Sequence, residues 1–230
     1  MSQLKVFTNK PKADDDEDDS GEGSFVRMFN TTSVINSADV YLDEPVKDVA
    51  YYRNLVYYMH QMQEHDSLNI WIDTPGGYLD GALAIIDAMH SSEGKVQAMV
   101  TGRASSAGSL IALSAPNLII GERARFMCHA VSYGAVGKQG DVESEVDYSR
   151  EMLRKVLSDA YEGFLKPEEL EMLLIGKTYW MDSPEVNARL EARQAYQESL
   201  RTACSSPLEQ IAEEAKVAPK KKPRTQKKST

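Results

Sequence analysis

The stretch Thr101–Ser109, TGRASSAGS, contains the residues best suited to chemistry. It follows the apolar run Val96–Val100, which predicts a buried strand, and precedes Leu110–Ser114, which continues as a helix of small and apolar residues. A serine at such a strand-to-helix turn presents its hydroxyl at a helix N-terminus, where free N–H groups and the helix dipole favour a developing negative charge. Ser105 and Ser106 are both candidates for a nucleophile, and in the simpler interpretation both are helix caps.

Two further stretches carry residues of the same kind. Residues Leu68–Gly77, LNIWIDTPGG, predict a strand that ends in a Pro-Gly-Gly turn before a helix over Gly81–Met89. Residues Ala124–His129, ARFMCH, predict a strand that ends in a histidine. We expect Gly102 to provide the tight exit from the strand that precedes the two serines, because glycine adopts backbone angles that other residues avoid.

These motifs, TPGG, GRASSAG and FMCH in this order and spacing, resemble the ClpP family of serine peptidases, the proteolytic subunits of the Clp protease. The family pattern is [ST]-P-G-G, then G-x-A-[AS]-S-x-[GA], then M-x-H, and the resemblance covers Asp39 to Glu185. It implies that Ser106 is the nucleophile and His129 the general base. It also implies that the N–H groups of Gly77 and Ala107 form the oxyanion hole.

The third member of a catalytic triad departs from this pattern. Aligning Ser183-Pro184-Glu185 with the family's A-P-E places Thr178 where the family carries an aspartate. A threonine hydroxyl can orient the imidazole but adds no charge to stabilise an imidazolium. Thr178 is therefore the possible third member. Asp182 is the alternative, although this alignment makes it the N-cap of the next helix.

The alternation of strands and helices predicts an α/β fold with a mostly parallel sheet. The resemblance implies the repeated ββα units of the ClpP/crotonase fold and a protruding handle helix. Other expected elements are strands over Phe25–Phe29 and Ala38–Leu42, and helices over Val46–Glu64, Asp141–Phe164 (the handle) and Val186–Ala203.

Composition divides the chain into three parts. Residues 1–24 contain the acidic block Asp14–Asp19 and little to bury, which predicts a disordered tail. The resemblance implies that residues 25–203 form a ClpP-like peptidase domain. Residues 204–230 form a second disordered tail, which is basic and contains Lys220–Arg224.

Charge and cysteine content limit the cellular setting. A formal charge of −9 argues against nucleic-acid binding, except through the basic C-terminal tail. Cys128 and Cys204 form no disulfide framework, and we expect Cys128 to face the core while His129 faces the site. No apolar run suggests a signal peptide or a membrane span. We therefore expect a cytoplasmic protein, in the host cytoplasm if it is phage-encoded.

The resulting prediction is a serine endopeptidase that cleaves protein or peptide substrates through Ser106 and His129. No spacing implies a metal or an organic cofactor. The resemblance implies a homo-oligomeric ring, and ATP would be used by a separate unfoldase because the chain has no G-x-x-x-x-G-K-[ST] loop.

Two alternative functions remain, and the sequence also suggests where the protein comes from. Thr178 favours a catalytically weak or inactive ClpP-like structural subunit, whereas a crotonase-type acyl-CoA enzyme is disfavoured by the serine and histidine at the motif positions. The charged tails and Thr178 resemble phage-encoded ClpP-like peptidases that act in capsid maturation.

Overall fold

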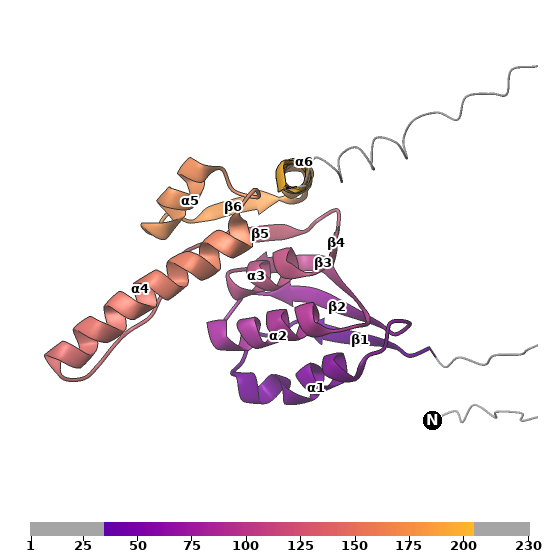
Figure 1. Cartoon of the computed structure of the whole chain (residues 1–230), viewed down its shortest axis with the longest axis horizontal. Coiled ribbons are helices and arrows are strands. Elements are labelled where there is room, and N and C mark those ends of the chain that lie inside the picture. Colours follow the sequence, from indigo (N-terminus) through magenta and orange to yellow (C-terminus); the bar gives the residue numbers. More distant parts are fainter. Residues whose placement is uncertain (1–34, 205–230) are drawn as a thin grey trace, which may run out of the picture. The chain divides into compact units, whose positions relative to one another are not determined.

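The computed structural model describes residues 35–204, which form a mixed α/β fold (Figure 1). Within these residues a six-stranded sheet has the order β1-β2-β3-β5-β6, and β4 pairs with β3 off this path. All pairings are parallel except that of β5 with β6. The strands are β1 (Ser37–Leu42), β2 (Ser67–Thr74), β3 (Lys95–Ser105), β4 (Asn117–Ile120), β5 (Arg125–Cys128) and β6 (Tyr179–Asp182). The predicted fold class is confirmed.

The helices pack around this sheet, and one of them extends away from it (Figure 1). They are the 3-10 helix η1 (Val49–Tyr52), α1 (Arg53–Gln61), α2 (Leu79–Ser91), α3 (Ala107–Ser114), α4 (Gln139–Tyr161), α5 (Pro167–Leu174) and α6 (Ser183–Cys204). In Figure 1 the N-terminal part of α4 points away from the sheet, as expected for a handle helix. None of the described helices has the length and apolar character needed to cross a bilayer.

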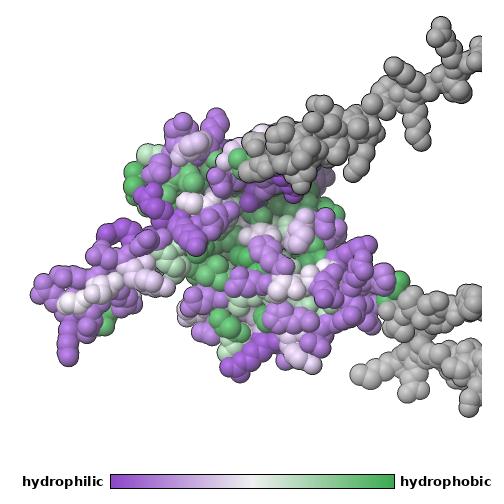
Figure 2. Space-filling view, in the orientation of Figure 1, coloured by the Kyte–Doolittle hydropathy of each residue, from purple (hydrophilic) through white to green (hydrophobic). Residues whose placement is uncertain are grey.

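The core lies between the sheet and helices α2 and α3. Alternate residues of β2 are buried, since successive side chains of a strand point to opposite faces. Leu68, Ile70 and Ile72 thus belong to the same buried cluster as Ile85 of α2 and Ile111 of α3. Figure 2 shows hydrophobic residues gathered on the body of the molecule, whereas the free end of α4 is mainly hydrophilic.

The helix predicted over Val46–Glu64 is shorter in the structure, because its first residues serve the Pro-Gly-Gly turn. Val46 N–H donates to the Gly76 carbonyl at 2.8 Å, and the Val46 carbonyl accepts from Tyr78 N–H at 3.0 Å. Asp48 then caps η1 by accepting from Ala50 N–H. The strand predicted over Phe25–Phe29 lies outside the described residues, and α5 was not predicted.

The role predicted for Gly102 is also wrong. Strand β3 continues through Gly102 to Ser105, so the exit from the strand comes later. Gly102 instead allows the Asp73 carboxylate to approach the backbone: a Cβ there would lie 2.6 Å from the Asp73 carboxyl carbon. Asp73 Oδ1 accepts from Arg103 N–H at 2.8 Å, which links β2 to the end of β3.

Candidate active site

Ser106 forms the turn between β3 and α3, and its backbone is strained. Its φ of 55° and ψ of −121° make it the only non-glycine residue with positive φ in the described part of the chain. Such a conformation costs on the order of 1–3 kcal/mol and persists only where neighbouring structure holds it. Ser106 N–H donates to the Met127 carbonyl at 2.7 Å, and Ser109 N–H donates to the Ser106 carbonyl at 2.9 Å.

This turn brings Ser106 into contact with His129. The parallel pairing of β3 with β5 sets Ser105 beside Met127, so His129 follows the end of β5 on the side of the serine. Ser106 Oγ lies 2.7 Å from Nε2 of His129, within hydrogen-bonding distance. Both side chains are half-buried. Cys128 is fully buried, which confirms that it faces the core.

Ser105 has a different environment from Ser106. It is 2% exposed, and its Oγ is buried without a hydrogen-bond partner among the described residues. Its backbone still belongs to β3. Of the two serines, only Ser106 contacts a base.

The Pro-Gly-Gly turn lies directly against Ser106. Gly76 has φ 91°, and a Cβ there would lie 2.7 Å from Ser106 Cβ and 2.6 Å from the Ser105 carbonyl oxygen. Val46 is hydrogen-bonded to the Gly76 carbonyl and to the Tyr78 N–H. In the described structure the Gly77 N–H, which lies between these two groups in the chain, has no backbone acceptor. The turn therefore holds a free N–H beside the serine.

Ala107 provides a second N–H at this position. It is the first residue of α3, where backbone N–H groups have no intrahelical acceptor. Gly77 and Ala107 line a pocket of about 250 Å³ together with Ser106 and His129. The remaining lining is mixed: it includes the polar residues Ser132 and Tyr161 and the apolar residues Pro75, Leu79, Leu110, Met127, Val131 and Leu157.

Thr178 immediately precedes β6, and Asp182 is its last residue. The antiparallel register pairs Cys128 with Tyr179 and Arg125 with Asp182. Continued by one residue, it sets Thr178 opposite His129. Asp182 is about 13 Å further along the strand, and its Oδ1 accepts from Glu185 N–H at the start of α6. Ser106 is the only residue that forms a hydrogen bond with His129 in the described structure, so neither Thr178 nor Asp182 does.

Two buried polar residues near Ser106, Ser109 and Tyr161, were not identified as site residues from the sequence. Ser109 Oγ donates to the Ser106 carbonyl at 2.7 Å and lies 2.8 Å from the Tyr161 hydroxyl. Burial raises the pKa of Cys128, which contacts both of these hydroxyls, to about 12. Ser109 could have been noted for its place near the motif, but no sequence signal links it to Tyr161, 52 residues away.

No cluster of His, Cys, Asp and Glu side chains suited to hold a metal ion is found in residues 35–204. The groups assembled here are a hydroxyl, an imidazole and two free N–H donors. This arrangement can support nucleophilic attack on a carbonyl and can stabilise the resulting oxyanion.

Comparison with known proteins assigns the family. The Clp protease family model matches residues 22–187. The chain belongs to the Clp protease family. This membership supports a peptidase function.

Several proteolytic subunits are similar to this chain. ATP-dependent Clp protease proteolytic subunit 1 of Chlamydia caviae is 27% identical over 174 residues, covering 72% of this chain and 90% of the relative. Proteolytic subunit 3 of Rhizobium meliloti is 27% identical over 128 residues (54% and 64%). The subunit of Streptococcus uberis is 30% identical over 128 residues (50% and 61%). The matches to the last two thus span less than two thirds of those relatives.

Proposed function

We propose that this chain is a serine-type endopeptidase with Ser106 as the nucleophile and His129 as the general base. The observation that carries the proposal is the 2.7 Å contact between Ser106 Oγ and His129 Nε2, made at a strained strand-to-helix turn. His129 takes the hydroxyl proton as Ser106 Oγ attacks the carbonyl carbon of a peptide bond. It then gives the proton to the leaving amine, and water hydrolyses the acyl-enzyme by the same steps.

The oxyanion of the tetrahedral intermediate is held by the N–H groups of Gly77 and Ala107. Both line the pocket that contains Ser106 and His129, and neither N–H is needed by the backbone structure around it. Each such donor contributes about 3–4 kcal/mol to stabilisation of the transition state in a comparable hydrolase. These donors provide much of the rate acceleration when the general base has no carboxylate partner.

His129 works without a carboxylate partner, and Thr178 is the third member. The β5–β6 register supports Thr178 over Asp182. A threonine at this position adds no negative charge to stabilise the imidazolium, so turnover is slow. Slow cleavage suffices for substrates that are cut once, as in capsid maturation by phage-encoded peptidases of this type.

The peptidase domain, residues 25–203, works in a homo-oligomeric ring that takes protein substrates from a separate ATP-dependent unfoldase. The relatives are named proteolytic subunits of an ATP-dependent protease, which supports both parts of this proposal. The chain itself contains no phosphate-binding loop motif.

A fluorophosphonate probe with intact-mass spectrometry tests the nucleophile. Wild type should gain one adduct, and Ser106→Ala none. Ser105→Ala is the matched control and should retain most of the labelling, because the Ser105 hydroxyl is buried away from His129. Labelling that survives in Ser106→Ala would refute the assignment.

The second candidate is an inactive structural subunit, favoured by the lack of a carboxylate hydrogen-bonded to His129 in the described structure. The same experiment separates the two functions. A folded, assembled wild-type protein that gains no adduct and cleaves no peptide would support the structural role and overturn the enzymatic one.

A further inference from the structure

A chain of buried hydroxyls connects the C-terminal end of α4 to the Ser106 turn. Ser109 on α3 and Tyr161 on α4 are fully buried, and their hydroxyl oxygens lie 2.8 Å apart. Ser109 Oγ also lies 2.7 Å from the Ser106 carbonyl oxygen. Cys128, next to His129 in the sequence, is buried against both hydroxyls. Neither Ser109 nor Tyr161 touches Ser106 Oγ or the imidazole through a hydrogen bond in the described residues.

The direction of these hydrogen bonds is determined by the number of protons. A carbonyl oxygen only accepts, so the single hydroxyl proton of Ser109 is used in the hydrogen bond that Ser109 donates to the Ser106 carbonyl. The Tyr161 hydroxyl must then donate to Ser109 Oγ. Burial raises the pKa of Tyr161 well above its ordinary value of 10.0, so this donor keeps its proton at neutral pH.

The Ser106 carbonyl that receives this bond belongs to the same peptide group as the Ala107 N–H. A trans peptide group is planar, and its C=O and N–H point in opposite directions. Holding the carbonyl toward the buried Ser109 hydroxyl therefore directs the Ala107 N–H to the other side, where Ala107 lines the pocket with Ser106 and His129. A hydrogen bond to the carbonyl also polarises the peptide group, which makes its N–H a stronger donor.

We propose that Ser109 and Tyr161 are positioning residues for the oxyanion hole: Tyr161 fixes Ser109, and Ser109 fixes the Ser106–Ala107 peptide group so that the Ala107 N–H points at the oxyanion. The inference rests on the proposed peptidase function. The backbone N–H groups of Ser109 and Leu110, at 2.9 and 3.3 Å, hold the same carbonyl along the helix. The Ser109 hydroxyl is the shortest of the three contacts and the only one from a side chain.

The expected kinetic effect is specific, because an oxyanion donor acts in the transition state and not on bound substrate. Ser109→Ala should lower kcat about tenfold with KM unchanged. Tyr161→Phe should lower kcat about threefold, since Ser109 keeps its bond to Ser106 but loses the donor that orients it. A peptide aldehyde forms a tetrahedral adduct with its oxygen in the oxyanion hole, so its affinity should fall by the same factors as kcat.

Two control variants remove hydroxyls of the same kind outside this chain of bonds. Tyr196→Phe removes a hydroxyl that donates to Glu162 Oε1 at 2.9 Å, at the same end of α4. Ser183→Ala removes a buried serine hydroxyl at the start of α6. Both should keep the wild-type kcat and aldehyde affinity.

A double variant separates catalysis from folding. Ser109→Ala leaves the Tyr161 hydroxyl buried without its acceptor and destabilises the protein, whereas Ser109→Ala/Tyr161→Phe removes both partners and should be more stable than Ser109→Ala alone. Its kcat should nevertheless stay as low as that of Ser109→Ala. The rates are measured per folded active site, with unfolding followed by chemical denaturation.

The outcomes are distinct. Suppose that wild type cleaves peptide and that folded Ser109→Ala keeps the wild-type kcat and aldehyde affinity. The positioning role is then overturned and the peptidase function stands. If Ser109→Ala does not fold, the double variant is tested in its place. If wild type itself neither cleaves peptide nor gains an adduct, the proposed function fails first. A fall in kcat and aldehyde affinity together, with KM constant and both controls unaffected, supports the positioning role.

Discussion

Among residues 35–204, no carboxylate is hydrogen-bonded to the imidazole of His129, whereas a complete triad supplies a fixed negative charge there. Nε2 of this imidazole contacts Ser106, and the β5–β6 register, continued by one residue, sets Thr178 opposite His129. Residues directly opposite in antiparallel strands have Cα atoms about 4.5–5.5 Å apart. Removal of the carboxylate from a serine-protease triad costs about 10⁴ in rate, which is about 5 kcal/mol of barrier.

Thr178→Asp should therefore raise the peptidase rate, because a carboxylate beside His129 stabilises the imidazolium that forms as Ser106 attacks. We expect a gain of about tenfold or more, a fraction of the full triad effect. The measurement is steady-state cleavage of a fluorogenic peptide at equal active-site concentration. Asp182→Asn is the control and should barely change the rate. Loss of cleavage in folded Asp182→Asn would make Asp182 the orienting carboxylate and refute the alignment.

Gly76 sets the approach of the Pro-Gly-Gly turn to the nucleophile. In Gly76→Ala the new Cβ would meet the Ser105 carbonyl oxygen at 2.6 Å, and the backbone would keep an unfavourable φ of 91°. We expect kcat/KM to fall by about 10² or more, as for other displacements of about 1 Å within an active site. Gly140→Ala, with open space around its Cβ, should keep the wild-type kcat/KM. Wild-type kcat/KM in Gly76→Ala would show that the turn does not position the serine.

At the scale of elements, the sequence predicts what local patterns encode. The strand expected before the Pro-Gly-Gly turn is β2, and the helix expected over Asp141–Phe164 matches α4 to within a few residues of Gln139–Tyr161. The pairing of Ser106 with His129 was implied by the resemblance of the three motifs to the ClpP family, and the parallel sheet explains how two distant motifs meet. The strand and the helix depend mainly on neighbours along the chain, whereas the pairing of the two site residues depends on the motifs.

What could not be predicted depends on contacts between distant segments. Helix α1 begins late because the backbone of Val46 is used by Gly76 and Tyr78. Gly102 is explained only by the side chain of Asp73 across the sheet. The contact of Ser109 with Tyr161 joins residues 52 positions apart, and no sequence pattern predicts that this serine and this tyrosine meet.

An ion pair joins α5 to α6. Arg189 of α6 binds both carboxylate oxygens of Glu169 on α5, at 2.6 and 2.9 Å. The Arg189 guanidinium, together with the Lys166 N–H, lowers the pKa of Glu169 from 4.5 to about 2. A carboxyl whose pKa is lower in the folded state stabilises the fold above its unfolded pKa, and this contribution is lost as pH falls through the folded value.

Glu169→Gln should accordingly lower the free energy of unfolding at pH 7. The shift in pKa corresponds to at most about 3 kcal/mol, and solvent screening at this partly exposed pair reduces it to about 1–2 kcal/mol. The difference between wild type and variant should shrink as pH falls from about 4.5 to about 2. Chemical denaturation at pH 7, 4 and 2.5 measures it. Glu171→Gln, which removes an exposed pair with Arg154, should cost less than about 0.5 kcal/mol, and an equal loss in both variants would contradict this account.

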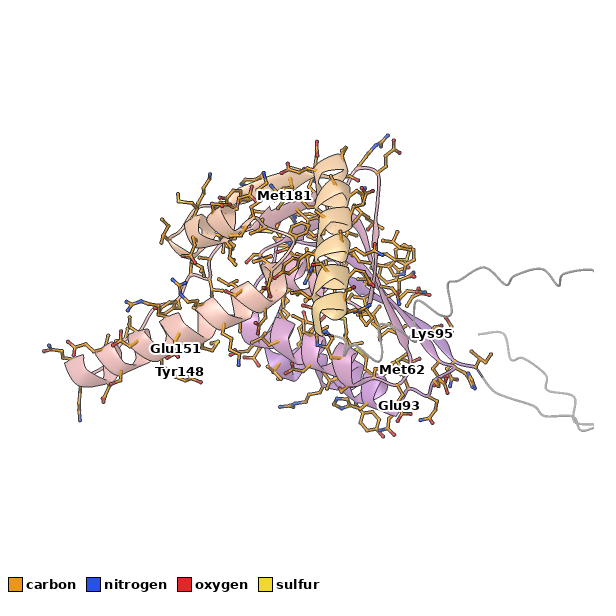
Figure 3. The ribbon with its side chains drawn as sticks, turned by 45° about the horizontal axis from the view of Figure 1, so that its top comes forward. Met62, Glu93, Lys95, Tyr148, Glu151 and Met181 are labelled. Atoms are coloured by element: carbon orange, nitrogen blue, oxygen red, sulfur yellow. The ribbon has the colours of Figure 1, made fainter. Side chains whose placement is uncertain are left out.

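For the whole molecule, the projecting part of α4 leads us to expect a partner. Figure 3 shows Tyr148 and Glu151 on the part of α4 that extends away from the sheet, and Tyr148 is 71% exposed. The four α4 residues that are buried lie nearer its C-terminal end: Leu153, Leu157, Ala160 and Tyr161. A helix whose N-terminal half packs against little of its own chain is mostly stabilised by a partner, since isolated helices of that length are marginal in water.

We therefore expect sedimentation velocity to give a ring-sized particle, larger than a dimer, at micromolar concentration. Tyr148→Lys should lower the mass of this particle or raise the concentration at which it forms, because it replaces an exposed aromatic residue by a charge at the projecting helix. Ser106→Ala, run in parallel, should assemble like wild type, since assembly and catalysis use different surfaces. A sharp monomer boundary for wild type across the concentration range would contradict both the role of α4 in assembly and proteolysis inside a closed compartment.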